Sequence, residues 1–126
     1  MAAVEVESSD QRVSAASIRI ADVCVDYARR SRYQGITLTD LCAVAGVSER
    51  RVRGAFYDVY GTSPTAQLRK LALSEVRRAL FEGSTARDAV TRVAADFGFA
   101  HLSRFAGHYR AAFGESPSTT IRRAMR

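Results

Sequence analysis

Hydrophobic and polar positions along the chain follow helical spacing, and one arrangement of them occurs twice. The first copy comprises Leu41, Ala45, Gly46, Val47, Ser48, Val52, Phe56, Gly61, Thr62, Ser63 and Pro64. The second copy comprises Val93, Phe97, Gly98, Phe99, Ala100, Phe105, Tyr109, Gly114, Glu115, Ser116 and Pro117. Each copy predicts a short helix that ends at glycine, a tight turn, and a second helix held by two bulky residues one turn apart. This pattern is typical of a helix-turn-helix, whose second helix can enter a major groove of DNA.

Apolar residues before and within the first copy predict three consecutive helices. An amphipathic helix is expected from Ser17, with an apolar face formed by Ile20, Val23, Cys24, Tyr27 and Ala28. Thr37 and Asp40 predict a capping box for the next helix, which ends at Gly46. The inward face of that helix is expected to comprise Leu38, Leu41, Cys42 and Ala45. Ser48 is a suitable N-cap for the third helix, whose buried face is expected to comprise Val52, Ala55, Phe56 and Val59.

A long helix is predicted to join the two copies. Ser63 is expected to be its N-cap and Pro64 its first residue, and no further glycine or proline occurs before Gly83. At ~1.5 Å per residue, a helix over 64–82 is roughly 28 Å long. That length approaches the ~34 Å between equivalent major-groove positions one helical turn apart.

The fold class predicted from these elements is all-α, with about seven helices. After a break at Gly83, Ser84 and Thr85, the sequence predicts a helix near 88–97, a second reading helix from about His101 to Ala112, and a brief terminal helix from Ser116 and Pro117. Two helix-turn-helix subdomains, 17–63 and 83–126, are then joined by a linker helix over 64–82. Residues 1–16 are small, polar and mildly acidic, which predicts a disordered tail or the remnant of a linker.

Positive charge is concentrated in the part of the chain that is expected to fold. The whole chain has 19 basic and 13 acidic residues, a net charge of +6. Residues 1–16 carry three acidic residues and one basic residue, so 17–126 carry 18 basic and 10 acidic residues, a net +8. Every basic residue except Lys70 is arginine, which suits bidentate recognition of phosphates and guanine edges. A GC-rich coding bias would also favour arginine, although it does not explain the surplus of charge.

Several functional classes are disfavoured by the sequence. Cys24 and Cys42 have no C-x-x-C spacing, so neither a disulfide framework nor a zinc site is expected. His101 and His108 have no cysteine or glutamate at ligand spacing, and a structural or phosphate-facing role is favoured over metal binding. No catalytic motif or cofactor motif is present, so neither an enzyme nor a bound cofactor is expected. Without a secretory signal or an apolar run of ~18 to 20 residues, the chain is expected to be cytoplasmic and not to contact a membrane.

The two copies resemble the DNA-binding domain of the AraC/XylS family of bacterial transcription regulators. Residues 41–56, L-C-A-V-A-G-V-S-E-R-R-V-R-G-A-F, are similar to the family's first helix-turn-helix. Residues 94–117, A-A-D-F-G-F-A-H-L-S-R-F-A-G-H-Y-R-A-A-F-G-E-S-P, resemble its second motif, A-x-x-x-G-F-x-x-x-S-x-F-x-x-x-F-x-x-x-F-G-x-S-P. Tyr109 replaces the usual phenylalanine. The likeness covers residues 17 to about 123, nearly all of the expected fold.

The resemblance implies two helix-turn-helix units, each inserting a helix into the major groove on one face of double-stranded DNA. Most family members also carry an N-terminal domain that senses an effector or dimerises, and that domain is absent from this chain. Two explanations stay open at this point: an excised DNA-binding fragment, or one of the short single-domain members.

Helix geometry assigns the face that would read DNA in each copy. With Val52 pointing inward and 100° per residue, Arg50, Gly54 and Tyr57 point outward, and Arg51 and Arg53 lie on the flanks. Arg50 and Arg53 are therefore the predicted first-copy readers. The same construction about Phe105 places Tyr109 and Ala112 inside and Ser103, Gly107 and Arg110 outside, with Arg104 and Ala106 on the flanks. The second-copy candidates are Ser103, Arg104 and Arg110.

Gly54 and Gly107 occupy equivalent outward positions in the two reading helices. A glycine inside a helix costs ~0.5 to 1 kcal/mol relative to alanine, so a repeated one suggests close approach of the backbone to the groove. Loss of a contact residue at both places, or coding bias, would give the same pattern. The first helix is expected to supply more base discrimination because it carries Arg50, Arg51 and Arg53, although these could also form a solvated face.

Further residues are candidates for contact with phosphates. They lie at helix starts or in the terminal helix: Ser48, Thr62, Ser63, His101, Ser116, Arg122 and Arg123. Capping alone is the alternative role of the hydroxyl groups. The function predicted from the sequence is a sequence-specific, double-stranded DNA-binding transcription regulator, an activator for which RNA polymerase is a further candidate partner. The alternative is a helical protein–protein adaptor in transcription that uses the same scaffold.

Overall fold

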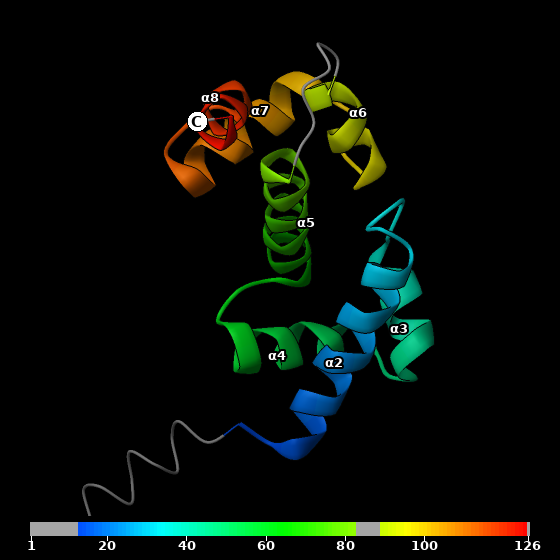
Figure 1. Cartoon of the computed structure of the whole chain (residues 1–126). Coiled ribbons are helices and arrows are strands. Elements are labelled where there is room, and N and C mark those ends of the chain that lie inside the picture. Colours follow the sequence, from blue (N-terminus) through cyan, green and yellow to red (C-terminus); the bar gives the residue numbers. More distant parts are fainter. Residues whose placement is uncertain (1–12, 83–88, 126) are drawn as a thin grey trace, which may run out of the picture.

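The computed structural model describes residues 13–82 and 89–125, and within these ranges it contains seven helices and no strand. The helices are α2 (Ala15–Arg30), α3 (Leu38–Ala45), α4 (Glu49–Tyr60), α5 (Pro64–Phe81), α6 (Ala89–Asp96), α7 (Leu102–Phe113) and α8 (Pro117–Ala124). Figure 1 shows α2, α3 and α4 at one end of α5 and α6, α7 and α8 at the other. The all-α prediction of two helical subdomains on a shared long helix is confirmed.

The first subdomain closes around a core that α2, α3 and α4 share with the start of α5. Its buried apolar residues are Ile20, Cys24, Val25, Ala28, Leu41, Val52, Ala55, Phe56 and Leu68. Side chains three and four positions apart on α2 and α4 interdigitate there, since these positions lie on one face of a helix. Because Leu68 belongs to α5, the linker helix begins inside the core of the first subdomain.

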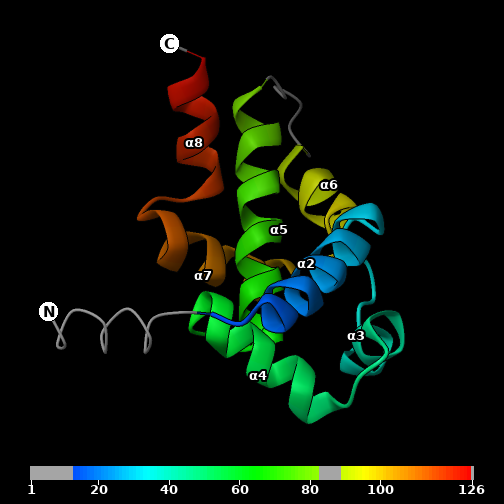
Figure 2. The same ribbon diagram turned by 90° about the horizontal axis from the view of Figure 1, so that it is seen from below.

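The second subdomain is built on the C-terminal half of α5. Figure 2 shows α5 running between α8 and α6, with α7 nearby. The buried core comprises Leu73, Val76, Leu80, Val93, Ala94, Phe105 and Tyr109. The two cores are distinct clusters, and α5 contributes one end of itself to each of them.

Local sequence signals define the helix ends as predicted. Thr37 and Asp40 form the expected capping box of α3. Gly46 and Gly61 follow α3 and α4 in the left-handed conformation, with φ of 70° and 72°. Ser63 accepts a hydrogen bond from the third residue of α5, as an N-cap does. These ends depend on neighbouring residues, which explains why the sequence alone predicted them.

The structure corrects three details of the prediction. The helix expected from Ser17 starts at Ala15 with Ser14 as its N-cap, so the tail predicted over 1–16 is helical at its end. Val59 is only half-buried, and Ala112, predicted to lie inside, is exposed. In place of Ala112, the inner face of α7 continues through Phe113, whose ring packs edge-on against Tyr109. Residues 1–12 of the predicted tail and the predicted helix break at residues 83–85 lie outside the described residues.

Candidate nucleic-acid interface

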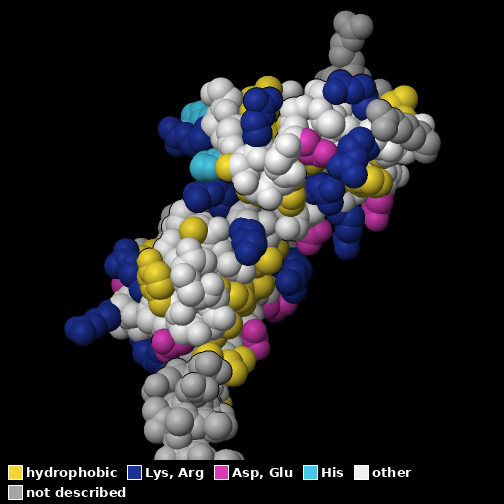
Figure 3. Space-filling model, turned by 90° about the vertical axis from the view of Figure 1, so that its left-hand side faces the viewer, with side chains coloured by type: hydrophobic (Ala, Val, Ile, Leu, Met, Phe, Trp, Pro, Cys, Tyr) yellow, Lys and Arg dark blue, Asp and Glu magenta, His cyan; other side chains and the backbone are white. Residues whose placement is uncertain are grey.

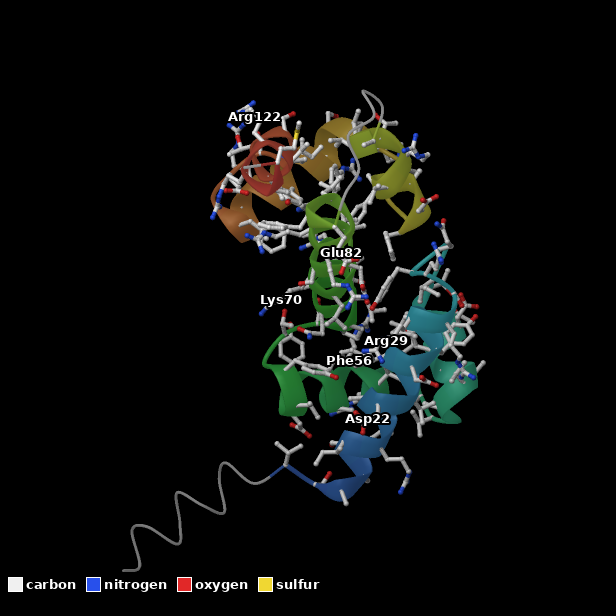
Figure 4. The ribbon with its side chains drawn as sticks, viewed as in Figure 1. Asp22, Arg29, Phe56, Lys70, Glu82 and Arg122 are labelled. Carbon is white, nitrogen blue, oxygen red and sulfur yellow. The ribbon has the colours of Figure 1, made fainter. Side chains whose placement is uncertain are left out.

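Helix α4 presents one buried and one polar face. Val52, Ala55 and Phe56 are fully buried against the rest of the first subdomain, so the opposite side of the helix faces solvent. Figure 4 shows Phe56 on the side of α4 that faces α2 and α5. Arg50 and Arg53 are exposed, as the helical construction predicted.

The outward face of α4 carries few internal restraints. Tyr57 is 57% exposed. Arg53 makes only an exposed ion pair with Glu49, at 3.6 Å between Nη1 and Oε1. No ion pair of Arg50 is found within 13–82 and 89–125. Exposed pairs of this kind contribute little, so both arginines are available to an outside partner.

Arg51 differs from its two neighbours because it points toward α2. Its Nη1 donates a hydrogen bond to Ser17 Oγ at 3.2 Å, and Ser17 Oγ in turn donates to Asp58 Oδ2 at 2.9 Å. Ser17 is fully buried, so this chain of contacts joins α2 to α4. The structure therefore separates Arg51, which is held against the scaffold, from Arg50 and Arg53.

Helix α7 presents an exposed face of small and basic side chains. Ser103, Arg104, Gly107 and Arg110 are all exposed, whereas Phe105 and Tyr109 are buried. The ends of α7 are fixed by aromatic packing of Phe99 on Phe105 and by Gly114, which has φ of 73°. Gly54 and Gly107 are each the sixth residue of a helix of 12 residues, and a Cβ at either position would meet open space.

Hydrogen bonds to α8 hold the inner side of α7. Tyr109 Oη lies 2.6 Å from Thr120 Oγ1, and Thr120 donates to Glu115 Oε2. Arg123 Nη1 contacts Glu115 Oε1 at 2.6 Å. The hydrogen bonds from Thr120 and Arg123 hold the pKa of Glu115 below its usual value. Tyr109, the one departure from the family motif, thus gains a buried partner that phenylalanine would lack.

The candidate phosphate contacts at helix starts divide into two kinds. Ser48, Ser63 and Ser116 each accept a hydrogen bond from a backbone N–H in the first turn, so their hydroxyl groups act as caps. Thr62 is half-buried, and His101 is exposed at the N-cap position of α7 without a side-chain cap bond. His101 precedes the first residue of α7, Leu102, whereas the sequence predicted the helix from about His101.

The two arginines of α8 are partly engaged. Arg122 Nη2 donates to Thr119 Oγ1 at 3.2 Å, and Arg123 is paired with Glu115. Both side chains are exposed. Figure 4 shows Arg122 at the outer side of α8.

Two basic residues of α5 lie on the side of this helix that faces α7. Arg69, Lys70 and His108 line one shallow depression between α5 and α7. Burial and the positive charges of Arg69 and Arg104 hold the pKa of His108 below its usual value. Figure 4 shows Lys70 extending outward from α5 at a level between the two subdomains. In the sequence, the signal for these basic residues is the adjacent pair Arg69 and Lys70 early in the predicted linker helix.

Charge is distributed unevenly over the molecular surface. Figure 3 shows the two histidines and several Lys and Arg side chains along one edge, over both halves of the molecule. Most of the visible Asp and Glu side chains lie toward the opposite edge, interspersed with further Lys and Arg side chains. An edge of this kind attracts a polyanion along its length.

Other kinds of site find no support in the described ranges. No group of His, Cys, Asp and Glu within 13–82 and 89–125 could hold a metal ion. Both cysteines are free, and Cys24 is buried in the first core. Burial raises the pKa of the Cys24 thiol to about 11, so this residue acts as a core side chain. No helix in the described part of the chain is long and apolar enough to cross a membrane.

Comparison with protein families and curated proteins identifies relatives of this fold. A helix-turn-helix domain family matches residues 41–123. The chain is 35% identical to the probable thc operon regulatory protein of Rhodococcus erythropolis over 103 residues, 82% of this chain and 31% of that protein. It is also 35% identical to a XylDLEGF operon transcriptional activator of Pseudomonas putida over 102 residues, 81% of this chain and 32% of that protein. The chain thus spans about a third of the length of these relatives.

Solved structures of similar fold are also transcriptional regulators. A probable AraC family transcriptional regulator from Rhodopseudomonas palustris CGA009 is 34% identical, with a TM-score of 0.74 over 84% of this chain and 97% of that one. A regulator from Chromobacterium violaceum has a TM-score of 0.78 at 21% identity and supports the fold alone. Sequence, fold and the duplicated motif agree, and the chain belongs to the AraC family of helix-turn-helix transcriptional regulators.

Proposed function

We propose that the chain binds double-stranded DNA sequence-specifically by inserting α4 and α7 into successive segments of the major groove. The observation that carries this proposal is the pair of helices itself. Each has 12 residues, one face buried in its own subdomain, and an exposed face with a glycine at the sixth position and arginines around it. The 18 residues of α5 span about 27 Å, a separation of the order of one turn of DNA.

Individual roles follow from where each side chain lies. Arg50 and Arg53 can reach base edges in the first segment, where arginine pairs with guanine N7 and O6. In the second segment of the major groove, the contacts are made by Ser103, Arg104 and Arg110. Arg51 acts indirectly, by holding α4 against α2. Tyr57, Gly54 and Gly107 lie at the closest approach of each helix to the groove.

Contacts with the DNA backbone surround these readers. The candidates lie at a helix start, in the depression between α5 and α7, or on α8: Ser48, Thr62, Ser63, Arg69, Lys70, His101, His108, Ser116, Arg122 and Arg123. Each neutralised phosphate releases counterions, so these contacts supply affinity and steep salt dependence rather than sequence preference.

The biological role that fits this domain is transcription activation in a bacterial regulator, with the cytoplasm as its place of action. Relatives from Pseudomonas putida are named operon transcriptional activators. Contact with RNA polymerase belongs to the same proposal, because an activator bound beside a promoter acts through the polymerase. An effector-sensing or dimerisation domain would belong to the whole regulator, as it does in most of the family.

Selection of DNA by the purified chain tests this function. Duplexes bound from a random pool are sequenced, and Kd for the consensus duplex and a scrambled duplex is measured between 50 and 200 mM salt. We expect a consensus with two separated half-sites and a log–log salt slope of about −0.9 per phosphate contacted.

The alternative function, a protein–protein adaptor, gives a different outcome in the same experiment. An adaptor held by apolar contacts would enrich no consensus and would show little dependence on salt. Equal affinity for the consensus and scrambled duplexes would reject sequence-specific recognition.

A further inference from the structure

The connection between α2 and α3 has an unusual and well-fixed backbone. Arg32 and Tyr33 are consecutive non-glycine residues in the left-handed region, with φ of 54° and 60°. Tyr33 N–H donates to the carbonyl of Ala28 at 2.8 Å, and Gln34 N–H donates to the carbonyl of Ser31 at 3.1 Å. Such a conformation persists only where surrounding contacts determine it. Further contacts of this loop come from the other subdomain.

Gln34 crosses from the first subdomain to the second. Its Nε2 donates to the carbonyl oxygens of Ala95 and Asp96, at 2.7 and 2.9 Å. These carbonyls lie at the C-terminal end of α6, where a helix leaves its last carbonyl groups without partners inside the helix. Both hydrogens of the amide therefore have acceptors on the opposite subdomain.

The residues beside Gln34 contact the turn that follows α6. Gly98 has φ of 92°, and a Cβ at this position would overlap with the carbonyl oxygen of Tyr33. The guanidinium group of Arg32 lies over the ring of Phe97, 5.7 Å from its centroid. Three successive residues of one loop thus lie against the turn of the second helix-turn-helix. That turn leads directly into α7.

Helix α5 also connects the two subdomains. The two buried cores are separate, and α5 is the helix shared by both. A cavity of about 220 Å³ lies between them, bordered by Leu68, Ala72 and Phe99 as well as by Tyr33 and Gly98. A single shared helix can bend or rotate. A second point of attachment is needed to fix how one subdomain is turned relative to the other.

We propose that the Arg32–Gln34 loop is a latch that fixes the orientation of α7 relative to α4 and thereby sets the half-site spacing the protein accepts. Gln34 is the principal positioning residue of the latch. The spacing part of this proposal rests on the proposed recognition of DNA by both helices. The orientation part concerns the free protein and stands independently.

The relative orientation of α4 and α7 determines which spacing of half-sites both helices can contact. One inserted base pair moves a half-site by about 3.4 Å along the axis and rotates it by roughly 35°. Two helices in a fixed relative orientation cannot adjust to both the shift and the rotation of a half-site, whereas two helices joined by a flexible connection can. Loss of the latch should therefore relax the spacing preference more than it weakens binding at the preferred spacing.

The experiment compares wild type, Gln34→Ala, Gln34→Glu and Ser31→Ala on three duplexes: the selected consensus, and the same duplex with one base pair inserted or deleted between half-sites. Ser31→Ala is the matched control, because its hydroxyl donates to the carbonyl of Tyr27 in α2, within the first subdomain. For wild type and the control, we expect altered spacing to raise Kd at least about tenfold. For both Gln34 variants, this penalty should be at least about threefold smaller. The spacing proposal would be overturned if a folded Gln34→Ala protein had the same ratio of Kd at altered spacing to Kd at consensus spacing as wild type.

A second measurement needs no DNA and separates failure of the latch from failure of the proposed function. Spin labels at Thr39→Cys on α3 and Thr91→Cys on α6, both exposed positions, are placed in a Cys42→Ala background. Pulsed electron paramagnetic resonance then gives the distance distribution between the subdomains. We expect a narrow distribution for wild type and Ser31→Ala, and a broader one for Gln34→Ala. Distance distributions of equal width for wild type and Gln34→Ala would overturn the latch proposal, whether or not the chain binds DNA.

Discussion

Tyr109 Oη lies 2.6 Å from Thr120 Oγ1, and this buried contact joins the second reading helix to the helix that follows it. Because Thr120 donates its hydrogen to Glu115, Tyr109 is the donor in the pair. Tyr109 is fully buried, so its hydroxyl has no access to water as an alternative partner. The orientation of α7 therefore depends on a polar contact as well as on aromatic packing.

Tyr109→Phe should lower the free energy of unfolding by about 0.5–1.5 kcal/mol, the usual range for one lost hydrogen bond. Chemical denaturation followed by circular dichroism measures this change. Thr120→Val and the double variant complete a cycle that isolates the pair. Additive effects of the two single substitutions would show that Tyr109 and Thr120 are not coupled.

Neighbouring arginines of α4 should respond differently to truncation. Arg50→Ala should cost about 1–3 kcal/mol of specific binding and relax preference at one base pair, since Arg50 is exposed and its side chain can reach a base. Arg51→Ala should lower stability by about 0.5–1.5 kcal/mol, because it removes the hydrogen bond to Ser17 that joins α4 to α2. Binding titrations and denaturation of both variants measure the two effects. An Arg51→Ala protein of wild-type stability with altered base preference would contradict this division.

The paired glycines can be tested by adding one methyl group. Gly54→Ala and Gly107→Ala should each raise stability by about 0.5–1 kcal/mol, because the new Cβ meets open space in the free protein. If the backbone approaches the groove closely, the same variants should bind consensus DNA more weakly despite their higher stability. Higher helicity with unchanged Kd would rule out close approach at these positions.

The sequence predicted those features that depend on residues close together in the chain. Thr37 and Asp40 are three positions apart, and Ser63 precedes Pro64, so the ends of α3 and α5 could be assigned from local signals. The duplicated spacing likewise predicted both reading helices. The buried face of α7 was predicted less well toward the end of the helix. An ideal step of 100° per residue placed Ala112 inside, whereas Phe113 packs there against Tyr109.

Contacts between distant residues could not be predicted from the sequence. Nothing near Arg51 in the chain distinguishes it from Arg50 and Arg53 or indicates Ser17 as its partner. The contacts of Gln34 have no local signal either, since its acceptors are backbone carbonyls 61 and 62 positions away. Both features depend on how the helices are arranged in space, which helical periodicity does not specify.

Glu115 should make the stability of the protein depend on pH in the acidic range. Its pKa in the folded state is held below 4.5 by hydrogen bonds from Thr120 and Arg123. A lowered folded pKa stabilises the protein above the unfolded pKa, and this contribution is lost as pH falls through the folded value. Denaturation between pH 7 and pH 3 should therefore show a smaller decline for Glu115→Gln than for wild type. Parallel pH profiles of the two proteins would contradict this role.

His108 should couple DNA binding to proton uptake. In the free protein, burial and the charges of Arg69 and Arg104 hold the pKa of His108 below its usual value. A DNA phosphate near the depression that His108 shares with Arg69 and Lys70 would raise this pKa, because negative charge favours the protonated form. Affinity for consensus DNA should then increase as pH falls through the pKa of the complex, and level off below that of the free protein. The increase in affinity between pH 8 and pH 5.5, measured as Kd, should be smaller for His108→Gln than for wild type. An identical pH profile for wild type and His108→Gln would place the phosphate elsewhere.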